Sequence, residues 1–186
     1  MVLKRKLSSD MNIFMVLLGL AALFEIIGWL LMGQSFLFNT QRLFIIILQV
    51  SIIGIIAVGV TQVIITSGID LSSGSVAAMS AMVAASFAQA SGGYMMYFDG
   101  IADLPVVVPI AIGILVGSAA GWLNGAITAY TGVPPFIPTL GMLVAARGIA
   151  VLYNEGNPII GLTDSYKFLG AGIMLVFIFI AVAALF

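Results

Sequence analysis

The chain has 186 residues, of which 62% are hydrophobic and only 7% are charged, and its formal net charge is −1. A typical soluble domain carries about 25% charged residues, so this composition excludes a soluble globular domain and indicates that most of the chain lies in lipid. The absence of cysteine and histidine excludes disulfides and histidine-dependent catalysis and argues against a metal site, and the small net charge provides no basic surface for nucleic acid.

Long apolar stretches with few or no charges predict six transmembrane helices, because about 20 apolar residues cross the hydrocarbon core of a bilayer. The run from Leu104 to Ala146 is too long for one span, and the stretch Gly132–Pro135 divides it into two. We therefore predict an all-α fold, a polytopic membrane helix bundle that forms a single domain over residues 1–186. The six spans are expected at about residues 12–33, 43–66, 71–91, 105–130, 135–153 and 169–186.

The first span follows Lys4, Arg5 and Lys6. Basic residues favour the cytoplasmic side of a membrane, so we expect the N-terminus in the cytoplasm and the loop with Asp99 and Asp103 outside. A signal peptide also places basic residues before an apolar region, but that region is usually about 7–15 residues long. We therefore interpret this longer apolar run as an uncleaved first span.

Residues 66–75 place two glycines, four serines and a single carboxylate between two apolar spans. Asp70 is well placed to cap a helix that starts near Leu71, because an N-cap side chain accepts a hydrogen bond from a free backbone amide. The segment near residues 67–75 is then either a capped turn at the membrane surface or a broken, re-entrant element that lines an aqueous path. The spacing alone favours neither interpretation.

The fourth span carries glycines at intervals of four residues, which lie close to one face of a helix. Glycine lets a neighbouring helix approach closely, so we expect this face to pack against another span. A pore-lining role is the alternative. The glycines are Gly113, Gly117, Gly121 and Gly125.

A second interruption precedes the fifth span. Pro135 suits the first turn of a helix, where its missing N–H would be unpaired in any case. Pro138 lies about one turn further in, where a proline bends the helix. We interpret this segment as a helix start, with a gate as the alternative.

Ionisable side chains are costly inside a membrane and are candidates for function. Three fall within the expected spans or at their edges, namely Glu25, Asp70 and Arg147. Glu25 and Arg147 also lie close enough to span ends for their side chains to reach the membrane surface. The uncharged Asn124, beside the glycine face, either binds hydroxyl groups or forms a hydrogen bond with another helix.

Two long motifs resemble a known family. Residues 68–75 resemble the G-I-D-L-S-x-G-S signature of bacterial ABC sugar permeases of the ribose, xylose and galactoside type. Asn124-Gly125, residues 132–141 and Arg147-Gly148 match further stretches of that family in the same order, over about residues 40–160. Ser67 departs from the family, in which glycine is common at this position. The resemblance implies that the chain covers only part of such a permease, as an N-terminal half or a truncated member.

The resemblance implies a permease subunit of a binding-protein-dependent importer in the bacterial inner membrane. Such a subunit carries a monosaccharide or related polyol by alternating access, as a homodimer in lipid, with a cytoplasmic ABC ATPase and a periplasmic or lipid-anchored sugar-binding protein as partners. The chain itself is expected to be no enzyme and to bind no cofactor, since the partner ATPase holds the ATP. The residues expected near the translocation path are Gly68, Asp70, Ser72, Ser75, Asn124, Pro134, Pro135, Phe136, Thr139 and Arg147.

Three other classes of protein stay open. An ion-coupled secondary transporter or channel needs acidic residues within the membrane, and only Glu25 and Asp70 qualify. An intramembrane enzyme is less favoured, because the carboxylates are too scattered for an aspartyl dyad. The third class is a membrane fragment that does not transport.

Overall fold

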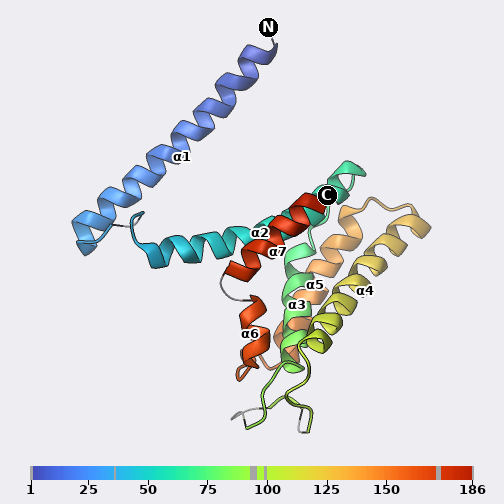
Figure 1. Ribbon diagram of the computed structural model, residues 1–186. Helices are drawn as coiled ribbons and strands as arrows, with labels where there is room; N and C mark the ends of the chain where they lie inside the picture. The colour runs from blue at the N-terminus through green and yellow to red at the C-terminus, as the bar shows by residue number, and fades with distance from the viewer. Residues whose placement is uncertain (1, 36, 93–95, 99, 171–172, 186) are drawn as a thin grey trace. The chain divides into compact units, whose positions relative to one another are not determined.

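A computed structural model describes residues 2–35, 37–92, 96–98, 100–170 and 173–185. Within these residues the fold is helical, and the only other pairing is an isolated bridge between Gln89 and Leu162. The helices, shown in Figure 1, are α1 (Val2–Met32), α2 (Thr40–Ile65), α3 (Ser73–Ser86), α4 (Val107–Thr131), α5 (Phe136–Tyr153), α6 (Asp164–Gly170) and α7 (Ile173–Leu185).

Four helices in the described part of the chain are long and apolar enough to cross a membrane. They are the section Met11–Met32 of α1, together with α2, α4 and α5. The short helices α6 and α7, with a bend of 53° between them, qualify together as either a broken span or a re-entrant loop. The prediction of an all-α, polytopic helix bundle is therefore confirmed.

The chain divides into two compact units, Met1–Gln49 and Val50–Phe186, and each is described by itself. In the first unit, the carboxylate of Glu25 joins α1 to the loop that follows it. Glu25 Oε1 accepts a hydrogen bond from the Ser35 hydroxyl, and Oε2 accepts one from the Leu37 backbone amide at 2.7 Å. This carboxylate therefore holds the loop after α1.

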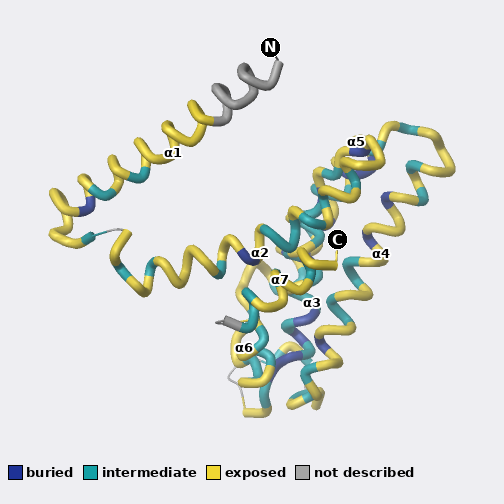
Figure 2. Tube along the Cα trace, turned by 45° about the horizontal axis from the view of Figure 1, so that its top comes forward, coloured by how far each residue is buried: buried dark blue, intermediate teal, exposed yellow. Residues whose placement is uncertain are grey.

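The second unit is built around α3, which packs against both α4 and α5. Their shared core consists of Met79 from α3, Ala120 from α4, and Ala146 and Ala150 from α5. The alanines at three of these positions let the helix backbones approach closely, as is usual between membrane helices. Figure 2 marks buried positions along all three helices.

α3 is shorter than the expected span at residues 71–91, because its end is decided by a distant segment. The chain leaves the helix after Ser86 and runs beside residues 161–163. The Ala90 amide donates to the Gly161 carbonyl and the Thr163 amide donates to the Ala88 carbonyl, both at 2.8 Å. These two hydrogen bonds replace the helical ones. α3 therefore has 14 residues, a length of about 21 Å.

The expected last span at residues 169–186 also differs from the structure. Its helical region begins earlier, with α6 at Asp164, and α7 follows as a separate helix. Residues 171, 172 and 186 of this expected span lie outside the described residues.

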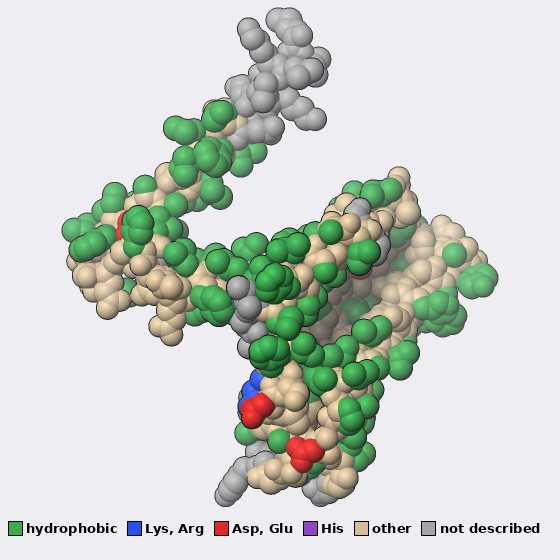
Figure 3. All heavy atoms as spheres, viewed as in Figure 1, with side chains coloured by type: hydrophobic (Ala, Val, Ile, Leu, Met, Phe, Trp, Pro, Cys, Tyr) green, Lys and Arg blue, Asp and Glu red, His purple; other side chains and the backbone are tan. Residues whose placement is uncertain are grey.

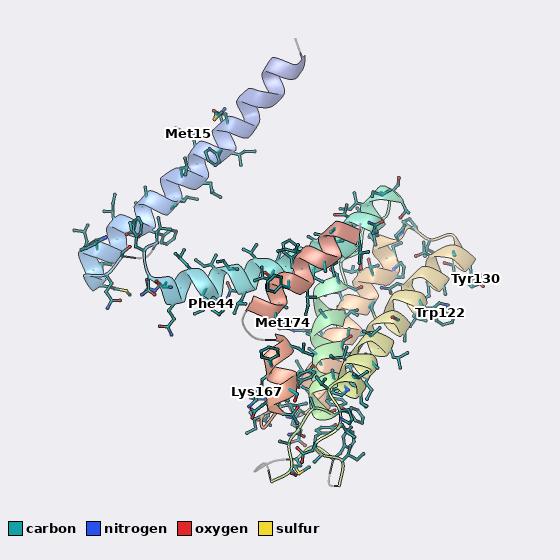
Figure 4. The ribbon with its side chains drawn as sticks, in the orientation of Figure 1. Met15, Phe44, Trp122, Tyr130, Lys167 and Met174 are labelled. Atoms are coloured by element: carbon teal, nitrogen blue, oxygen red, sulfur yellow. The ribbon has the colours of Figure 1, made fainter. Side chains whose placement is uncertain are left out.

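Large hydrophobic side chains cover the outside of the long helices. On α4, Trp122 is 72% exposed and Tyr130 is 90% exposed, and Figure 4 shows both pointing away from the helix, as do Met15 on α1 and Phe44 on α2. Figure 3 shows that hydrophobic side chains dominate the visible face, with charged groups in small isolated spots. Apolar surface of this extent is unfavourable in water and suits a lipid environment.

A tyrosine pair closes the end of the second unit where α3 and α5 finish. The rings of Tyr97 and Tyr153 stack with centroids 4.6 Å apart, and the Tyr97 hydroxyl donates to the Tyr153 carbonyl at 2.8 Å. Desolvation and the neighbouring Tyr153 raise the pKa of Tyr97, so this phenol keeps its proton and its donor role. The Tyr153 hydroxyl lies 2.9 Å from Ser86 Oγ.

Tyr153→Phe is expected to lower the free energy of unfolding by about 1 kcal/mol, because it removes the hydrogen bond with Ser86 and keeps the ring stack. Tyr153→Ala removes both and is expected to cost about 3 kcal/mol or more. Thermal unfolding in detergent micelles, followed by circular dichroism, measures both changes. Equal stability of the two variants would show that the ring stack contributes nothing.

Candidate functional site

The break between α2 and α3 begins with a sharp reversal of the backbone. Ser67 adopts a left-handed conformation with φ +62°, and the amide of Gly68 donates to the Val63 carbonyl at 2.9 Å. A Cβ added at Gly68 would lie only 2.9 Å from Val63 Cγ1 and 3.2 Å from the Val63 carbonyl oxygen. Only glycine fits this position without displacing the end of α2.

The carboxylate of Asp70 organises the second half of the break. Its Oδ1 accepts hydrogen bonds from both the backbone amide and the hydroxyl of Ser72, each at 2.7 Å. α3 begins at Ser73, and its N-cap is Ser72, without a side-chain capping bond. The prediction that Asp70 caps a helix starting near Leu71 is therefore wrong. An aspartate can bond the backbone two residues ahead and hold a turn instead.

Two hydrogen bonds tie the break to other helices. Asn124 of α4 donates from Nδ2 to Ser72 Oγ at 3.0 Å, and both side chains are buried, with exposed fractions of 8% and 1%. Thr139 of α5 donates to the Ile69 carbonyl at 3.2 Å, and its oxygen also lies within 3.2 Å of two carbonyls of its own helix. Asp70, Ser72, Asn124 and Thr139, which are far apart in the sequence, thus form one connected site.

Two cavities adjoin this site. The first cavity has a volume of about 350 Å³ and lies between the break, α4 and α5. The second cavity, of about 370 Å³, lies between α2, α3 and α4. Asp70 and Gly121 line both cavities, so the two spaces meet at these residues. The polar side chains lining the first cavity are Thr66, Asp70, Asn124, Thr128 and Thr139.

The glycine face of α4 divides into two parts. A Cβ added at Gly113 would lie 3.2 Å from the Ala84 Cβ, and one at Gly117 would lie 3.3 Å from Ser80 Oγ, so this part lies close to α3. A Cβ at Gly121 or Gly125 would meet no atom within 4 Å. Gly121 and Gly125 instead line the first cavity.

The structure brings together some of the residues expected near the path and not others. Gly68, Asp70, Asn124, Pro135 and Thr139 line the first cavity, and Ser72 is buried behind them. Ser75 is half-buried on α3, and Pro134, Phe136 and Arg147 are exposed. Arg147 lines a separate space with Met82 and Ala150.

Sequence reasoning missed two threonines of the first cavity, Thr66 and Thr128. Thr128 lies four residues after Asn124, and this spacing places both on one face of α4. Applying the helical period to Asn124 would therefore have found it. Thr66 lies in the turn that ends α2, where no helical period applies.

Ser67→Gly is expected to raise the free energy of unfolding by up to about 1 kcal/mol. A residue with a Cβ is strained in the left-handed conformation, and glycine is not, although glycine gains freedom in the unfolded chain. Ser67→Ala keeps the Cβ and serves as the matched control, with no gain expected. Thermal unfolding in detergent measures both variants, and a gain for alanine equal to that for glycine would contradict the strain.

Comparisons with known proteins place the chain among transport proteins. A family model described as "branched-chain amino acid transport system / permease component" matches residues 42–186. The chain is 38% identical over 134 residues to the ribose import permease protein RbsC of Escherichia coli (strain K12), which covers 72% of this chain and 38% of the relative. It is 36% identical over 130 residues to the galactose/methyl galactoside import permease protein MglC of the same strain, covering 68% and 39%.

A relative from another bacterium is also an import permease. The ribose import permease protein RbsC of Bacillus subtilis (strain 168) is 34% identical over 151 residues, which covers 81% of this chain and 42% of the relative. The chain thus spans about two fifths of the length of the curated relatives it matches. No solved structure matches it.

Proposed function

The chain belongs to the family of branched-chain amino acid transport system permease components, and from this premise we propose that it is the membrane subunit of an ATP-driven importer for a monosaccharide or related polyol. The names of its relatives support a sugar, since they are import permeases for ribose and for galactose or methyl galactoside. The proposed substrate therefore carries several hydroxyl groups and no charge.

The observation that carries this proposal is the polar site at the break. Asp70, Ser72 and Asn124 form a hydrogen-bonded chain beside a cavity of about 350 Å³, a volume within the usual range for small-molecule sites. Non-helical backbone at membrane depth is tolerated where it lines a water-filled cavity or is buried in protein. In the proposed mechanism this cavity is part of the sugar path, with Gly68, Pro135 and Thr139 as further lining residues.

The proposed mechanism is alternating access without bond chemistry in this chain. A cytoplasmic ABC ATPase binds and hydrolyses ATP, and a periplasmic or lipid-anchored binding protein delivers the sugar. Two copies of the permease, with their N-termini in the cytoplasm of a bacterial cell, move between outward-open and inward-open states. The hydrogen bonds from Asn124 and Thr139 to the break link any movement of α4 or α5 to the cavity wall.

Uptake of radiolabelled ribose and galactose tests this function. The chain is expressed with its ATPase and binding protein in a bacterial strain that lacks its own ribose and galactose permeases. We expect uptake that stops on ATP depletion and persists when a protonophore collapses the proton gradient. Uptake that instead follows the gradient would indicate an ion-coupled transporter. Absence of uptake, together with failure of the chain to co-purify with the ATPase, would contradict the importer.

A further inference from the structure

The hydrogen bonds of the site settle which of its atoms are donors and which are acceptors. The Ser72 hydroxyl donates its one hydrogen to Asp70 Oδ1, so Ser72 Oγ must accept from Asn124. This requirement places Asn124 Nδ2 toward Ser72 and leaves Asn124 Oδ1 as an acceptor. Among the described residues, neither Asn124 Oδ1 nor Asp70 Oδ2 receives a hydrogen bond, and both side chains line the first cavity.

Asn124 Nδ2 has two hydrogens and directs one of them to Ser72, whereas the threonines of the first cavity have used their single donors. The Thr66 hydroxyl donates to the Val63 carbonyl at 2.8 Å, and the Thr128 hydroxyl donates to the Asn124 carbonyl at 2.9 Å. Thr139 likewise directs its one hydrogen to backbone carbonyls. A hydroxyl has one donor and two acceptor lone pairs, so each threonine can offer only acceptor capacity to a ligand.

From this pattern we propose that the first cavity recognises its ligand through the ligand's own hydrogen-bond donors, with Asp70 Oδ2 and Asn124 Oδ1 accepting from hydroxyl groups of a neutral polyol. This inference rests on the proposed function. It adds which atoms of the cavity contact the sugar, and that these atoms accept hydrogen bonds from it. Substrates that can only accept hydrogen bonds would leave both oxygens unpaired, which is costly in a water-poor site. The cavity therefore favours polyols over ethers and other acceptor-only molecules.

Oxygen acceptors also suit a metal cation. Lysine and arginine are absent from the described lining of the first cavity, and its single carboxylate is Asp70. Hard cations are usually held by about six or more oxygen ligands at close range, whereas this cavity has about 350 Å³ and a wall that includes Gly121, Gly125 and Pro135. Its size and its partly apolar wall fit the carbon skeleton of a polyol better than a bare ion.

Thiol labelling tests this inference without relying on transport. The chain has no cysteine, so Gly125→Cys introduces a unique thiol into the first cavity at a position with open space around it. The labelling rate with a small, water-soluble methanethiosulfonate reagent is measured in proteoliposomes, with and without ribose or galactose. We expect labelling that either sugar slows. Gly148→Cys on α5, which has open space for a Cβ and lines neither cavity, is the control, and its labelling should not respond to sugar.

Two changes then test the polarity of recognition. Adding Asp70→Asn to Gly125→Cys turns an acceptor into a potential donor, and about tenfold more sugar should be needed for equal protection. Deoxyfluoro analogues of the two sugars, in which fluorine replaces a donating hydroxyl, should protect about tenfold less well at one or more ring positions. The analogue series needs no further substitution in the chain, so it stands even if the Asp70→Asn chain fails to fold.

The outcomes separate this inference from the proposed function. Two outcomes would overturn the inference that the cavity recognises hydrogen-bond donors. In the first, a sugar and all its fluorinated analogues slow labelling equally; in the second, labelling responds to sodium ions and not to sugars. Either outcome would still support an aqueous path. A Gly125→Cys thiol that never reacts would overturn both, because the first cavity would then be closed to water.

Discussion

Replacing Asp70 with alanine is expected to lower sugar uptake by at least about tenfold, while the chain still inserts into the membrane. The carboxylate accepts from two donors of Ser72, a residue that is only 1% exposed. Without it, the buried amide and hydroxyl are left without their acceptor, at a cost of about 1–3 kcal/mol each, and the break no longer holds Ser72 toward Asn124. Uptake of labelled sugar and immunoblotting of membrane fractions measure the two effects.

The control for this prediction is another aspartate. Asp164 forms an ion pair with Lys167 at 2.6 Å, and its side chain is 98% exposed. Exposed ion pairs contribute little to stability, so Asp164→Ala should leave both uptake and membrane content unchanged. Unchanged uptake by the Asp70→Ala variant would remove Asp70 from the path.

Two single substitutions to valine, at two glycines on the same face of α4, are expected to give opposite phenotypes. At Gly113 the added side chain would press on the Ala84 Cβ, only 3.2 Å from the new Cβ. Overpacking of this kind costs about 1–3 kcal/mol, so Gly113→Val should lower the unfolding temperature. At Gly121 the new Cβ meets nothing within 4 Å and projects where the first and second cavities meet. Gly121→Val should therefore fold normally and lose most of its uptake.

The two readouts for this pair are unfolding temperature in detergent and uptake in cells. Gly148→Val provides the control for placing a β-branched residue in a helix, because its Cβ also meets nothing within 4 Å and Gly148 lines neither cavity. Normal uptake by Gly121→Val would show that the junction of the cavities is not on the path. An unchanged unfolding temperature for Gly113→Val would show that α3 and α4 are not tightly packed there.

The sequence was informative where one physical effect dominates. The scarcity of charge leaves lipid as the only suitable solvent, and the length of the apolar runs then predicts an all-α membrane bundle. The same contrast between polar and apolar residues locates the break, because Asp70 and its serines stand between two uncharged runs. Asn124 was a candidate for the same reason.

Competing interactions explain what could not be predicted. The start of α3 depends on whether the Asp70 carboxylate caps a helix that begins near Leu71 or holds a turn by bonding Ser72. The same sequence is compatible with both arrangements. The end of α3 depends on pairing with residues 161–163, and no local sequence pattern predicts this pairing. The glycine face has a uniform spacing, yet only Gly113 and Gly117 lie close to α3, since the crossing of two helices decides where contact ends.

The number of residues between two bonded groups determines when their hydrogen bond can form during synthesis of the chain. The bonds from Ser35 and Leu37 to Glu25 span only 10 and 12 residues, so the loop after α1 can close as soon as it leaves the ribosome. The bonds that build the site span 52 residues for Asn124 to Ser72 and 70 for Thr139 to Ile69. Chains are made at about 5–20 residues per second, so the break waits several seconds for α4 and α5. During that interval the Ser72 hydroxyl lacks its partner Asn124 and the Ile69 carbonyl lacks its partner Thr139, so the polar groups of the break have only one another as partners.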